Sequence, residues 1–261
     1  MHGRCEVLEA DCLKQDVLEA LVGGEVIAAR IKSFVSSDLA EILSEQILSG
    51  AVGRYRNAPS IGRIGEAFYE TQNIPDEVEA YFASASLNIQ ELRTRCYPYQ
   101  SPIDLLRCML DEVWPAGAQL ESLYGRKMYV GLSRVVKPGI PLLAHVDHFS
   151  TDAPGCYQAQ SVQVQLAANA YLSVPSKGGA LQIWAQRVSR KAFDEMRGDN
   201  YGVEPANLGQ PDLEITPVAG ELVIFNSRYL HAVSPGAPEP RLSLSCFIGF
   251  RGYATPLSYW S

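Results

Sequence analysis

The chain has 261 residues, of which 47% are apolar and 20% are charged. This composition is typical of a globular protein and excludes a chain that is disordered throughout. A chain of this length can bury one large core without disulfide bonds or a structural metal, so we expect residues 1–261 to form a single domain. The net charge of −7 argues against nucleic acid as a partner, because binding to phosphates needs clustered cations.

The cysteines and the first residues indicate the compartment. The six cysteines are scattered without a CxxC pair, so the sequence predicts neither a disulfide scaffold nor a zinc–thiolate site. The first residues, MHGRCEVLEADCLK, carry acids where a signal peptide needs a basic start. No later apolar run approaches the ~18 residues of a membrane span. We therefore expect a cytoplasmic protein without a membrane partner.

Residues 1–125 are predicted to be mostly helical and to support the rest of the domain. In residues 14–48 apolar side chains recur every three or four positions, and a Gly-Gly pair divides the segment into two helices. Residues 76–94 and 103–123 show the same period, and each follows a proline, which is tolerated at a helix start. Residues 53–70 are rich in Gly, Arg and Tyr and are predicted to form a loop.

Residues 126–250 change to short β-type segments bounded by Gly, Pro, Asn or Ser. These segments are KMYVGLSRVV, PLLAHVDH, SVQVQLAANAYLSV, GALQIWAQ, ELVIFNS and RLSLSCFIGF. Many short antiparallel strands favour a sandwich or jelly roll, so the predicted class is α+β with the N-terminal helices packed on a jelly-roll core. Residues 185–215 are too polar and too long for a hairpin turn, and we interpret them as a candidate lid.

The segment LLAHVDH presents candidate metal ligands. On an extended strand residues i and i+2 project to the same face, so His145 and Asp147 point together while His148 faces away. A second segment, ELVIFNSRYLHAVSPG, is predicted to be a strand that runs into a turn bearing His231. Two imidazoles and one carboxylate on one face of a metal form the triad that suits non-haem Fe(II).

Ten residues after His231 comes Arg241, with Ser243 on the same strand face. An inward guanidinium beside a metal is costly unless it meets an anion, and its planar fork matches a carboxylate. This combination predicts a site that binds 2-oxoglutarate.

The motifs HVD (145–147), GGALQIW (178–184), ITPVAGELVIFNSRYLHAVSPG (215–236) and RLSLS (241–245) resemble those of Fe(II)/2-oxoglutarate-dependent dioxygenases of the prolyl-hydroxylase-like kind. The resemblance covers residues 126–250. It implies a double-stranded β-helix, also called a jelly roll or cupin-like fold.

The resemblance also implies residue roles. His145, Asp147 and His231 would hold iron, and Arg241 with Ser243 would clasp the distal carboxylate of 2-oxoglutarate. O2 would be the second cosubstrate, and the outcome would be hydroxylation of an unactivated C–H bond. Radical halogenases replace the carboxylate ligand with Gly or Ala, so the presence of Asp147 favours hydroxylation.

Further contacts are predicted at lower specificity. Tyr129 and Arg134, on the strand before HVD, lie where relatives often place a cosubstrate or substrate contact, and the alternative for both is a solvated strand face. Candidate substrate contacts, each with an alternative role in packing or in a solvated turn, are Arg63, His148, Trp184, Asn226 and Arg228.

We expect an oxygenase that hydroxylates a small metabolite, either a free amino acid or an amino-acid derivative, and we list a homodimer among the expected partners. One alternative is a hydroxylase of a protein or peptide side chain. Another is a non-catalytic jelly-roll module that binds a metal, although such a module has no need of a carboxylate clamp at Arg241.

Overall fold

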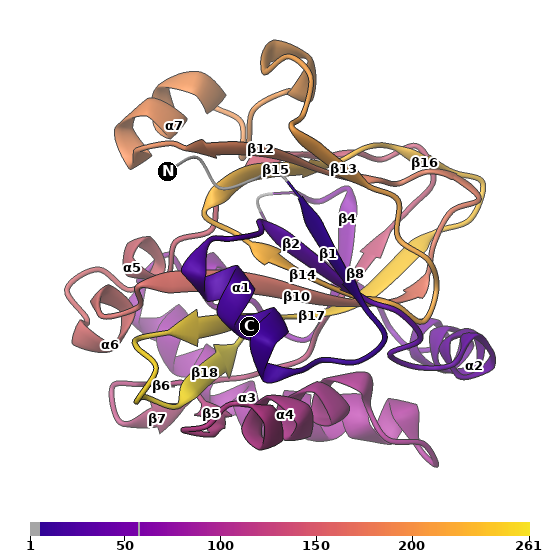
Figure 1. Cartoon of the computed structure of the whole chain (residues 1–261), viewed down its shortest axis with the longest axis horizontal. Helices are drawn as coiled ribbons and strands as arrows, with labels where there is room; N and C mark the ends of the chain where they lie inside the picture. Colours follow the sequence, from indigo (N-terminus) through magenta and orange to yellow (C-terminus); the bar gives the residue numbers. More distant parts are fainter. Residues whose placement is uncertain (1–5, 57) are drawn as a thin grey trace.

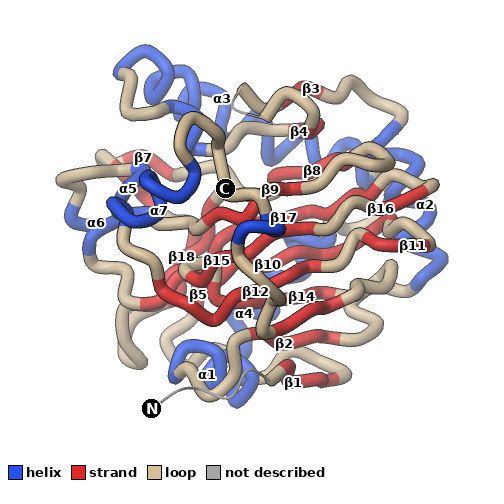
Figure 2. Tube along the Cα trace, turned by 90° about the horizontal axis from the view of Figure 1, so that it is seen from above, coloured by secondary structure: helices blue, strands red, loops and turns tan. Residues whose placement is uncertain are grey.

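The computed structural model describes residues 6–56 and 58–261. Three layers are visible in Figure 1: helices α3 (Pro75–Cys96) and α4 (Pro102–Val113) below, a large sheet in the middle, and a small sheet above. Seen from above in Figure 2, the strands of both sheets cross the molecule and the helices lie around them. Among the described helices none has the length and apolar character needed to cross a membrane.

The large sheet has ten strands in the order β1-β2-β14-β10-β17-β8-β4-β3, with β18 and β5 attached beside β17. Its centre is the antiparallel pair of β10 and β17, each ten residues long. The strands are β1 (Val7–Ala10), β2 (Ala28–Ile31), β3 (Gly53–Arg54), β4 (Ile61–Ile64), β5 (Ala118–Leu120), β8 (Leu132–Val136), β10 (Val164–Ser173), β14 (Leu222–Asn226), β17 (Arg241–Phe250) and β18 (Leu257–Trp260).

The small sheet faces the large one and has the order β13-β12-β15-β9. Its strands are β9 (Leu142–His145), β12 (Leu181–Arg187), β13 (Leu213–Ile215) and β15 (Tyr229–Val233). Two further pairs are formed by β6 (Ser122–Leu123) with β7 (Arg126–Lys127) and by β11 (Lys177–Gly178) with β16 (Gly236–Ala237). All strands of the small sheet run antiparallel to their neighbours.

The two faces of β17 differ in chemistry because side chains alternate along a strand. Leu242 and Leu244 are fully buried in the core that the large sheet shares with the helices. Arg241, Ser243 and Ser245 point the other way, toward the small sheet, and are buried as well. The space between the two sheets is therefore lined in part by polar groups, which is unusual for a core and marks a site.

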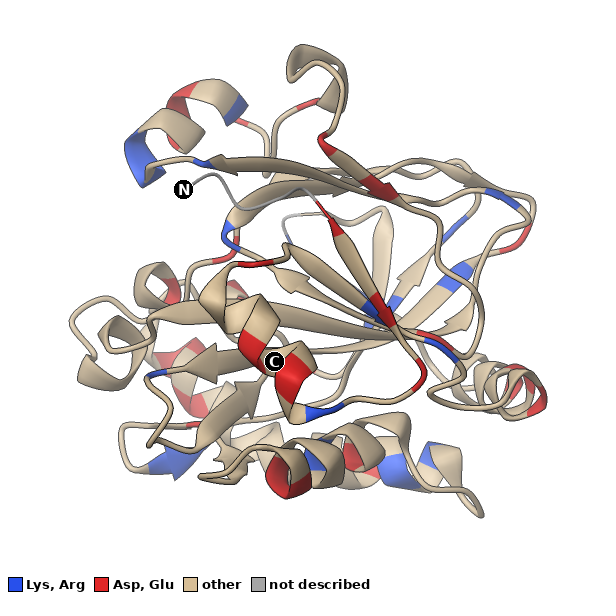
Figure 3. Cartoon of the chain, in the orientation of Figure 1, with Lys and Arg blue, Asp and Glu red and all other residues tan. Residues whose placement is uncertain are grey.

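The helices begin where the sequence predicts. Residues 14–48 form two helices, α1 (Gln15–Gly23) and α2 (Ser37–Leu48), and α2 starts at Ser36, whose hydroxyl accepts a hydrogen bond from Leu39 N at 3.3 Å. α3 and α4 each have proline in the first turn, as expected. The shorter helices are α5 (Phe149–Asp152), α6 (Tyr157–Gln160), α7 (Arg190–Arg197), η1 (Phe68–Thr71) and η2 (Pro205–Asn207). Basic and acidic residues are interspersed on α7 and on the helices of the lower layer (Figure 3).

Three expectations about the elements were wrong. The helix expected over residues 103–123 ends at Val113 and is followed by β5 and β6, and the mostly helical part up to residue 125 also holds β2, which pairs with β14 in the large sheet. Residues 53–70 are not simply a loop, because they include β3, β4 and η1. His231 lies within the strand β15 rather than in a turn. These strands are short, and most of their partners are far away in the sequence, so local periodicity could not reveal them.

Residues 185–215 are ordered around α7, η2 and β13 rather than forming a bare loop. Two backbone hydrogen bonds of 2.8 Å join Val203 to Ala144 in β9. Leu143 N donates a hydrogen bond to the Tyr201 hydroxyl, also at 2.8 Å. The segment is thereby attached to the strand that ends at His145. Its role as a lid stays a prediction.

Candidate metal and carboxylate site

Three predicted metal ligands meet at the edge of the small sheet. His145 is the last residue of β9, and His231, its direct partner in the antiparallel register, lies in the middle of β15. Their ring centroids are 4.3 Å apart. Asp147 follows two residues after β9 ends, where its backbone N–H donates to Ser227 O at 3.0 Å. Pairing of two strands therefore brings together residues that are far apart in the sequence.

The three side chains offer one donor atom each within 4.8 Å of one another. Asp147 Oδ2 lies 3.3 Å from His231 Nε2, and Asp147 Oδ1 lies 4.0 Å from His145 Nε2. The Nδ1 atoms of the histidines face the backbone carbonyls of Leu143 at 2.8 Å and Tyr229 at 2.9 Å. These bonds fix each ring and leave both Nε2 atoms free, which is the usual support of a metal-binding histidine. The donor set therefore fits a divalent metal.

The charge states also suit a metal. The pKa of His145 is lowered to about 4, chiefly by burial and secondly by the neighbouring His231. Burial raises the pKa of Asp147, but the hydrogen bond from His231 and the charges of His145, His231 and Arg134 outweigh it, so the pKa falls to about 2. A neutral imidazole and an ionised carboxylate are the forms that bind a metal.

Arg241 and Ser243 lie together on the inner face of β17, as predicted. Arg241 is 4% exposed, and its guanidinium makes one weak contact of 3.5 Å from Nη1 to Gly179 O. It lies over the Tyr171 ring, 5.3 Å from the centroid, and burial lowers its pKa. Among the described residues neither Arg241 Nε nor Ser243 Oγ has a hydrogen-bond partner. Buried polar groups are normally paired, so these two atoms fit an absent anion.

Most of the candidate cosubstrate and substrate contacts already have hydrogen-bond or ion-pair partners within the protein. Tyr129 is buried, and its hydroxyl donates to Gly131 O at 2.6 Å. Trp184 Nε1 donates to Gly209 O at 3.2 Å, which ties β12 to the segment 185–215. Arg63 forms ion pairs with Glu70 and Glu66.

The turn before His231 is also engaged. Asn226 Oδ1 accepts a hydrogen bond from the backbone N of Arg228, and the Arg228 guanidinium donates to the carbonyls of Val162 and Gln163. His148 lies one residue after Asp147, at the start of α5, and burial lowers its pKa. Among the candidate cosubstrate and substrate contacts, His148 therefore lies beside the metal ligands. The roles of all these candidates stay predictions.

Arg134 is a second arginine of the site, from the strand segment that the sequence marks as a region of cosubstrate or substrate contacts. Arg134 in β8 pairs directly with Ser243, so both side chains project between the sheets. Its strand segment, KMYVGLSRVV, alternates, but the sequence does not show that β8 lies beside β17. Tyr171 in β10 pairs with Ser243 from the other side and was missed because the sequence does not show that pairing.

Comparisons with known proteins agree with this geometry. Residues 130–249 match the family model of the 2OG-Fe(II) oxygenase superfamily. The L-gamma-glutamyl-L-propargylglycine hydroxylase of Streptantibioticus cattleyicolor is 33% identical over 150 residues, which are 57% of this chain and 54% of that protein. The match thus spans about half the length of this relative. The Leucinostatins biosynthesis cluster protein S of Purpureocillium lilacinum is 25% identical over 207 residues, 76% of this chain and 82% of that protein.

Solved structures share the fold at low sequence identity. An N-substituted L-amino acid dioxygenase from Burkholderia ambifaria superposes with a TM-score of 0.63 at 17% identity, covering 95% of this chain and 91% of that one. HygX from Streptomyces hygroscopicus, with nickel and 2-oxoglutarate bound, gives a TM-score of 0.54 at 15% identity, covering 91% and 87%. The matched motifs, the donor cluster and the family model agree: residues 130–249 are similar to the 2OG-Fe(II) oxygenase superfamily, whose cofactor is Fe(II) and whose cosubstrate is 2-oxoglutarate.

Proposed function

We propose that this protein is an Fe(II)/2-oxoglutarate-dependent dioxygenase that hydroxylates an unactivated C–H bond of a small metabolite, namely a free amino acid or an amino-acid derivative. One observation carries the proposal. The donor cluster of His145, Asp147 and His231 and the buried side chains of Arg241 and Ser243 both lie between the two sheets, and Arg241 Nε and Ser243 Oγ have no hydrogen-bond partner among the described residues.

We assign each residue one task. His145 Nε2, Asp147 and His231 Nε2 hold the metal, and the bonds from the Nδ1 atoms to backbone carbonyls keep the two rings oriented. Arg241 and Ser243 bind the distal carboxylate of 2-oxoglutarate through charge-assisted hydrogen bonds. When bound, Fe(II) and 2-oxoglutarate supply the activation of O2 and the oxidising chemistry. The protein keeps metal positions open and excludes water from the interior.

The strand order supports a finer description of the fold. Four strands of the large sheet, β8-β17-β10-β14, face the four strands β9-β15-β12-β13 of the small sheet. We assign these eight strands as a double-stranded β-helix. The preceding residues 1–125 then cover its outer face, the whole chain forms one domain, and residues 185–215 act as a lid.

The relatives support the class of substrate. The name of the Streptantibioticus relative describes a hydroxylase of a γ-glutamyl amino acid, and one structural neighbour is described as a dioxygenase of N-substituted L-amino acids. A small-molecule substrate of this class needs no large docking surface.

A screen for succinate release tests the proposal. The purified protein is loaded with Fe(II) under anaerobic conditions, mixed with 2-oxoglutarate and one panel compound, and exposed to oxygen. The panel holds the L-amino acids, their N-acyl and γ-glutamyl derivatives, the primary amide of each acid, and short peptides. We expect at least one amino acid or derivative to stimulate succinate formation. Stimulation by peptides alone would favour a protein substrate, and metal binding without any turnover would favour a non-catalytic module. Light scattering on the same sample tests the homodimer.

A further inference from the structure

Arg134 is a second guanidinium in the interior between the two sheets. It pairs with Ser243 in β17 on one side and with Arg63 in β4 on the other. Its neighbour Val135 belongs to the core on the helix side, so strand alternation directs Arg134 to the opposite face, toward the small sheet. Unlike Ser243, which is fully buried, the Arg134 side chain keeps some exposure to solvent. A ligand that enters the interior can therefore reach it.

The contacts of Arg134 hold the guanidinium in place without neutralising it. Nε donates to the Tyr55 hydroxyl at 3.2 Å, and the guanidinium carbon lies 5.9 Å from the centroid of the same ring. Tyr55 in turn stacks on Tyr69, with centroids 6.1 Å apart. Nε is thus engaged, and the two Nη groups, which form the fork that matches a carboxylate, have no hydrogen bond to a described residue.

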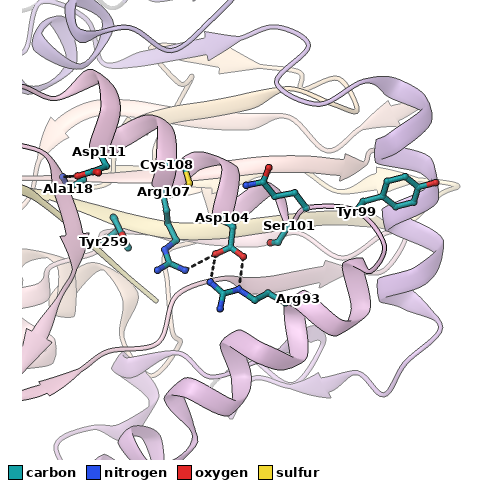
Figure 4. A pocket seen from close by; sticks show the side chains of 10 residues that line it. Arg93, Tyr99, Ser101, Asp104, Arg107, Cys108, Asp111, Ala118 and Tyr259 are labelled. Atoms are coloured by element: carbon teal, nitrogen blue, oxygen red, sulfur yellow. Dashed lines mark hydrogen bonds and ion pairs between the residues drawn. The ribbon is translucent and has the colours of Figure 1, made fainter.

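Several other arginines of the described chain have a carboxylate partner, whereas Arg228 donates to backbone carbonyls. Arg63, the cross-strand neighbour of Arg134, binds Glu70 at 2.7 Å and Glu66 at 3.1 Å. On the helix side, Arg93 and Arg107 share Asp104 at the wall of a cavity of about 450 Å³ (Figure 4). No ion pair connects Arg134 to an acidic residue within residues 6–56 and 58–261.

A charge count of the interior leaves one positive charge uncompensated. Arg134 and Arg241 are cationic, and Asp147 is the anion that lies within electrostatic reach of Arg134. Asp152, whose pKa burial raises to about 8, is neutral at pH 7. One ferrous ion and one doubly charged 2-oxoglutarate add no net charge. The surplus positive charge therefore persists when both are bound, and burying an unpaired charge is costly.

The inference drawn from this surplus charge rests on the proposed function and refines it. We propose that Arg134, oriented by Tyr55, is the residue that binds a carboxylate of the substrate and so restricts the enzyme to acidic metabolites. A substrate with one carboxylate and no ammonium group, such as an N-acyl amino acid, neutralises the interior. An ester or amide of the same compound leaves the charge unpaired.

Binding to the Fe(II)·2-oxoglutarate form tests this role without turnover. The visible charge-transfer absorption of that complex is recorded anaerobically while each carboxylic acid of the panel, or its primary amide, is titrated. We expect acids but not amides to perturb the wild-type spectrum. In Arg134→Gln we expect the acids to bind at least about 10-fold more weakly, with 2-oxoglutarate affinity unchanged within about twofold. Arg134→Lys keeps the charge and should recover part of the loss. Arg126→Gln, at a surface ion pair with Glu79, is the matched control and should behave as wild type.

Thermal melting of the ligand-free protein separates binding from structure. An arginine retained for a ligand, without a carboxylate partner, should leave Tm unchanged or raise it when it is replaced by Gln. A fall of more than about 4 °C would assign Arg134 to the structure and overturn the proposal. The proposal is also overturned if acids bind Arg134→Gln as they bind wild type, if no acid of the panel perturbs the wild-type spectrum, or if 2-oxoglutarate affinity falls about 10-fold in the variant. A wild type that shows no charge-transfer absorption at all would instead refute the proposed function itself.

Discussion

At the scale of single residues, the site combines groups that would be unstable alone. Asp147 is an ionised carboxylate beside two imidazoles, and Arg241 is a buried cation without a described counter-ion. Burial of Arg241 costs folding free energy and becomes favourable when a diacid is bound, whereas the lowered pKa of Asp147 shows that its neighbours already favour the charged carboxylate. The cost of burying Arg241 is the physical signature of a binding site rather than of a structural ion pair.

Replacing Asp147 with Ala should abolish function and spare the fold. The variant lacks the anionic ligand, so we expect Fe(II)-dependent succinate formation to fall at least about 100-fold. Circular dichroism should remain that of the wild type because the Asp147 side chain packs against no apolar core. Asp199→Ala, on the exposed turn after α7, is the control. Wild-type activity in Asp147→Ala would contradict the ligand assignment.

Arg241→Ala should weaken 2-oxoglutarate binding without weakening the empty protein. Loss of a charge-assisted, desolvated contact should raise the Kd for 2-oxoglutarate roughly 10- to 100-fold, as measured by isothermal titration with Mn(II) in place of iron. Since Arg241 Nε has no partner in the described chain, the Tm of the ligand-free variant should not fall far. An unchanged Kd would place the carboxylate contact elsewhere.

Asp152 should make the stability of the metal-free protein depend on pH. Burial raises the pKa of this carboxyl from an ordinary value near 4 to about 8. The folded state therefore holds a proton that the unfolded state releases, so stability is full below the unfolded pKa and falls as pH rises toward 8. In Asp152→Asn this loss disappears, and the Tm advantage of the variant over wild type should grow between pH 4 and pH 8. An advantage that does not change with pH would show that Asp152 titrates normally.

At the scale of elements, the segment 185–215 is attached to the metal site by few bonds. The backbone pairing of Val203 with Ala144 and the hydrogen bond to Tyr201 connect it to β9, two residues or fewer before His145. The part between β12 and β13, residues 188–212, can therefore open without unfolding the sheets. Such a segment can admit substrate and then cover it.

Tyr201→Phe should loosen this segment selectively. A neutral hydrogen bond contributes about 1 kcal/mol, so its loss should raise the open population and the rate of protease nicking in residues 185–215 about fivefold. Tyr157→Phe is the control because that side chain is 80% exposed. Mass spectrometry of the fragments measures the rate. Bound Fe(II) and 2-oxoglutarate with substrate should slow nicking in both proteins, and equal nicking with and without ligands would count against closure.

At the scale of the whole molecule, the sequence predicts chemistry better than topology. The HxD motif, the strand segment around His231 and the Arg-x-Ser pair each carry a local signal, so the donor cluster could be predicted. Strands such as β2 and β4 could not, since four residues with a distant partner leave no period of their own. Arg134 could be predicted only as a general cosubstrate or substrate contact, because its position beside Ser243 depends on which strand pairs with β8. Site residues are found from sequence when their spacing is local, and they are missed when only sheet register brings them together.

The direct pairing of His145 with His231 has a thermodynamic consequence. In the denatured chain the two histidines lie on segments that move independently, so they bind a metal ion more weakly than in the folded protein. Each tenfold excess of free metal over its dissociation constant should thus add about 1.4 kcal/mol to the free energy of unfolding. The bound ion therefore cross-links two neighbouring strands. Chelators should lower the melting temperature as they lower the logarithm of the free metal concentration.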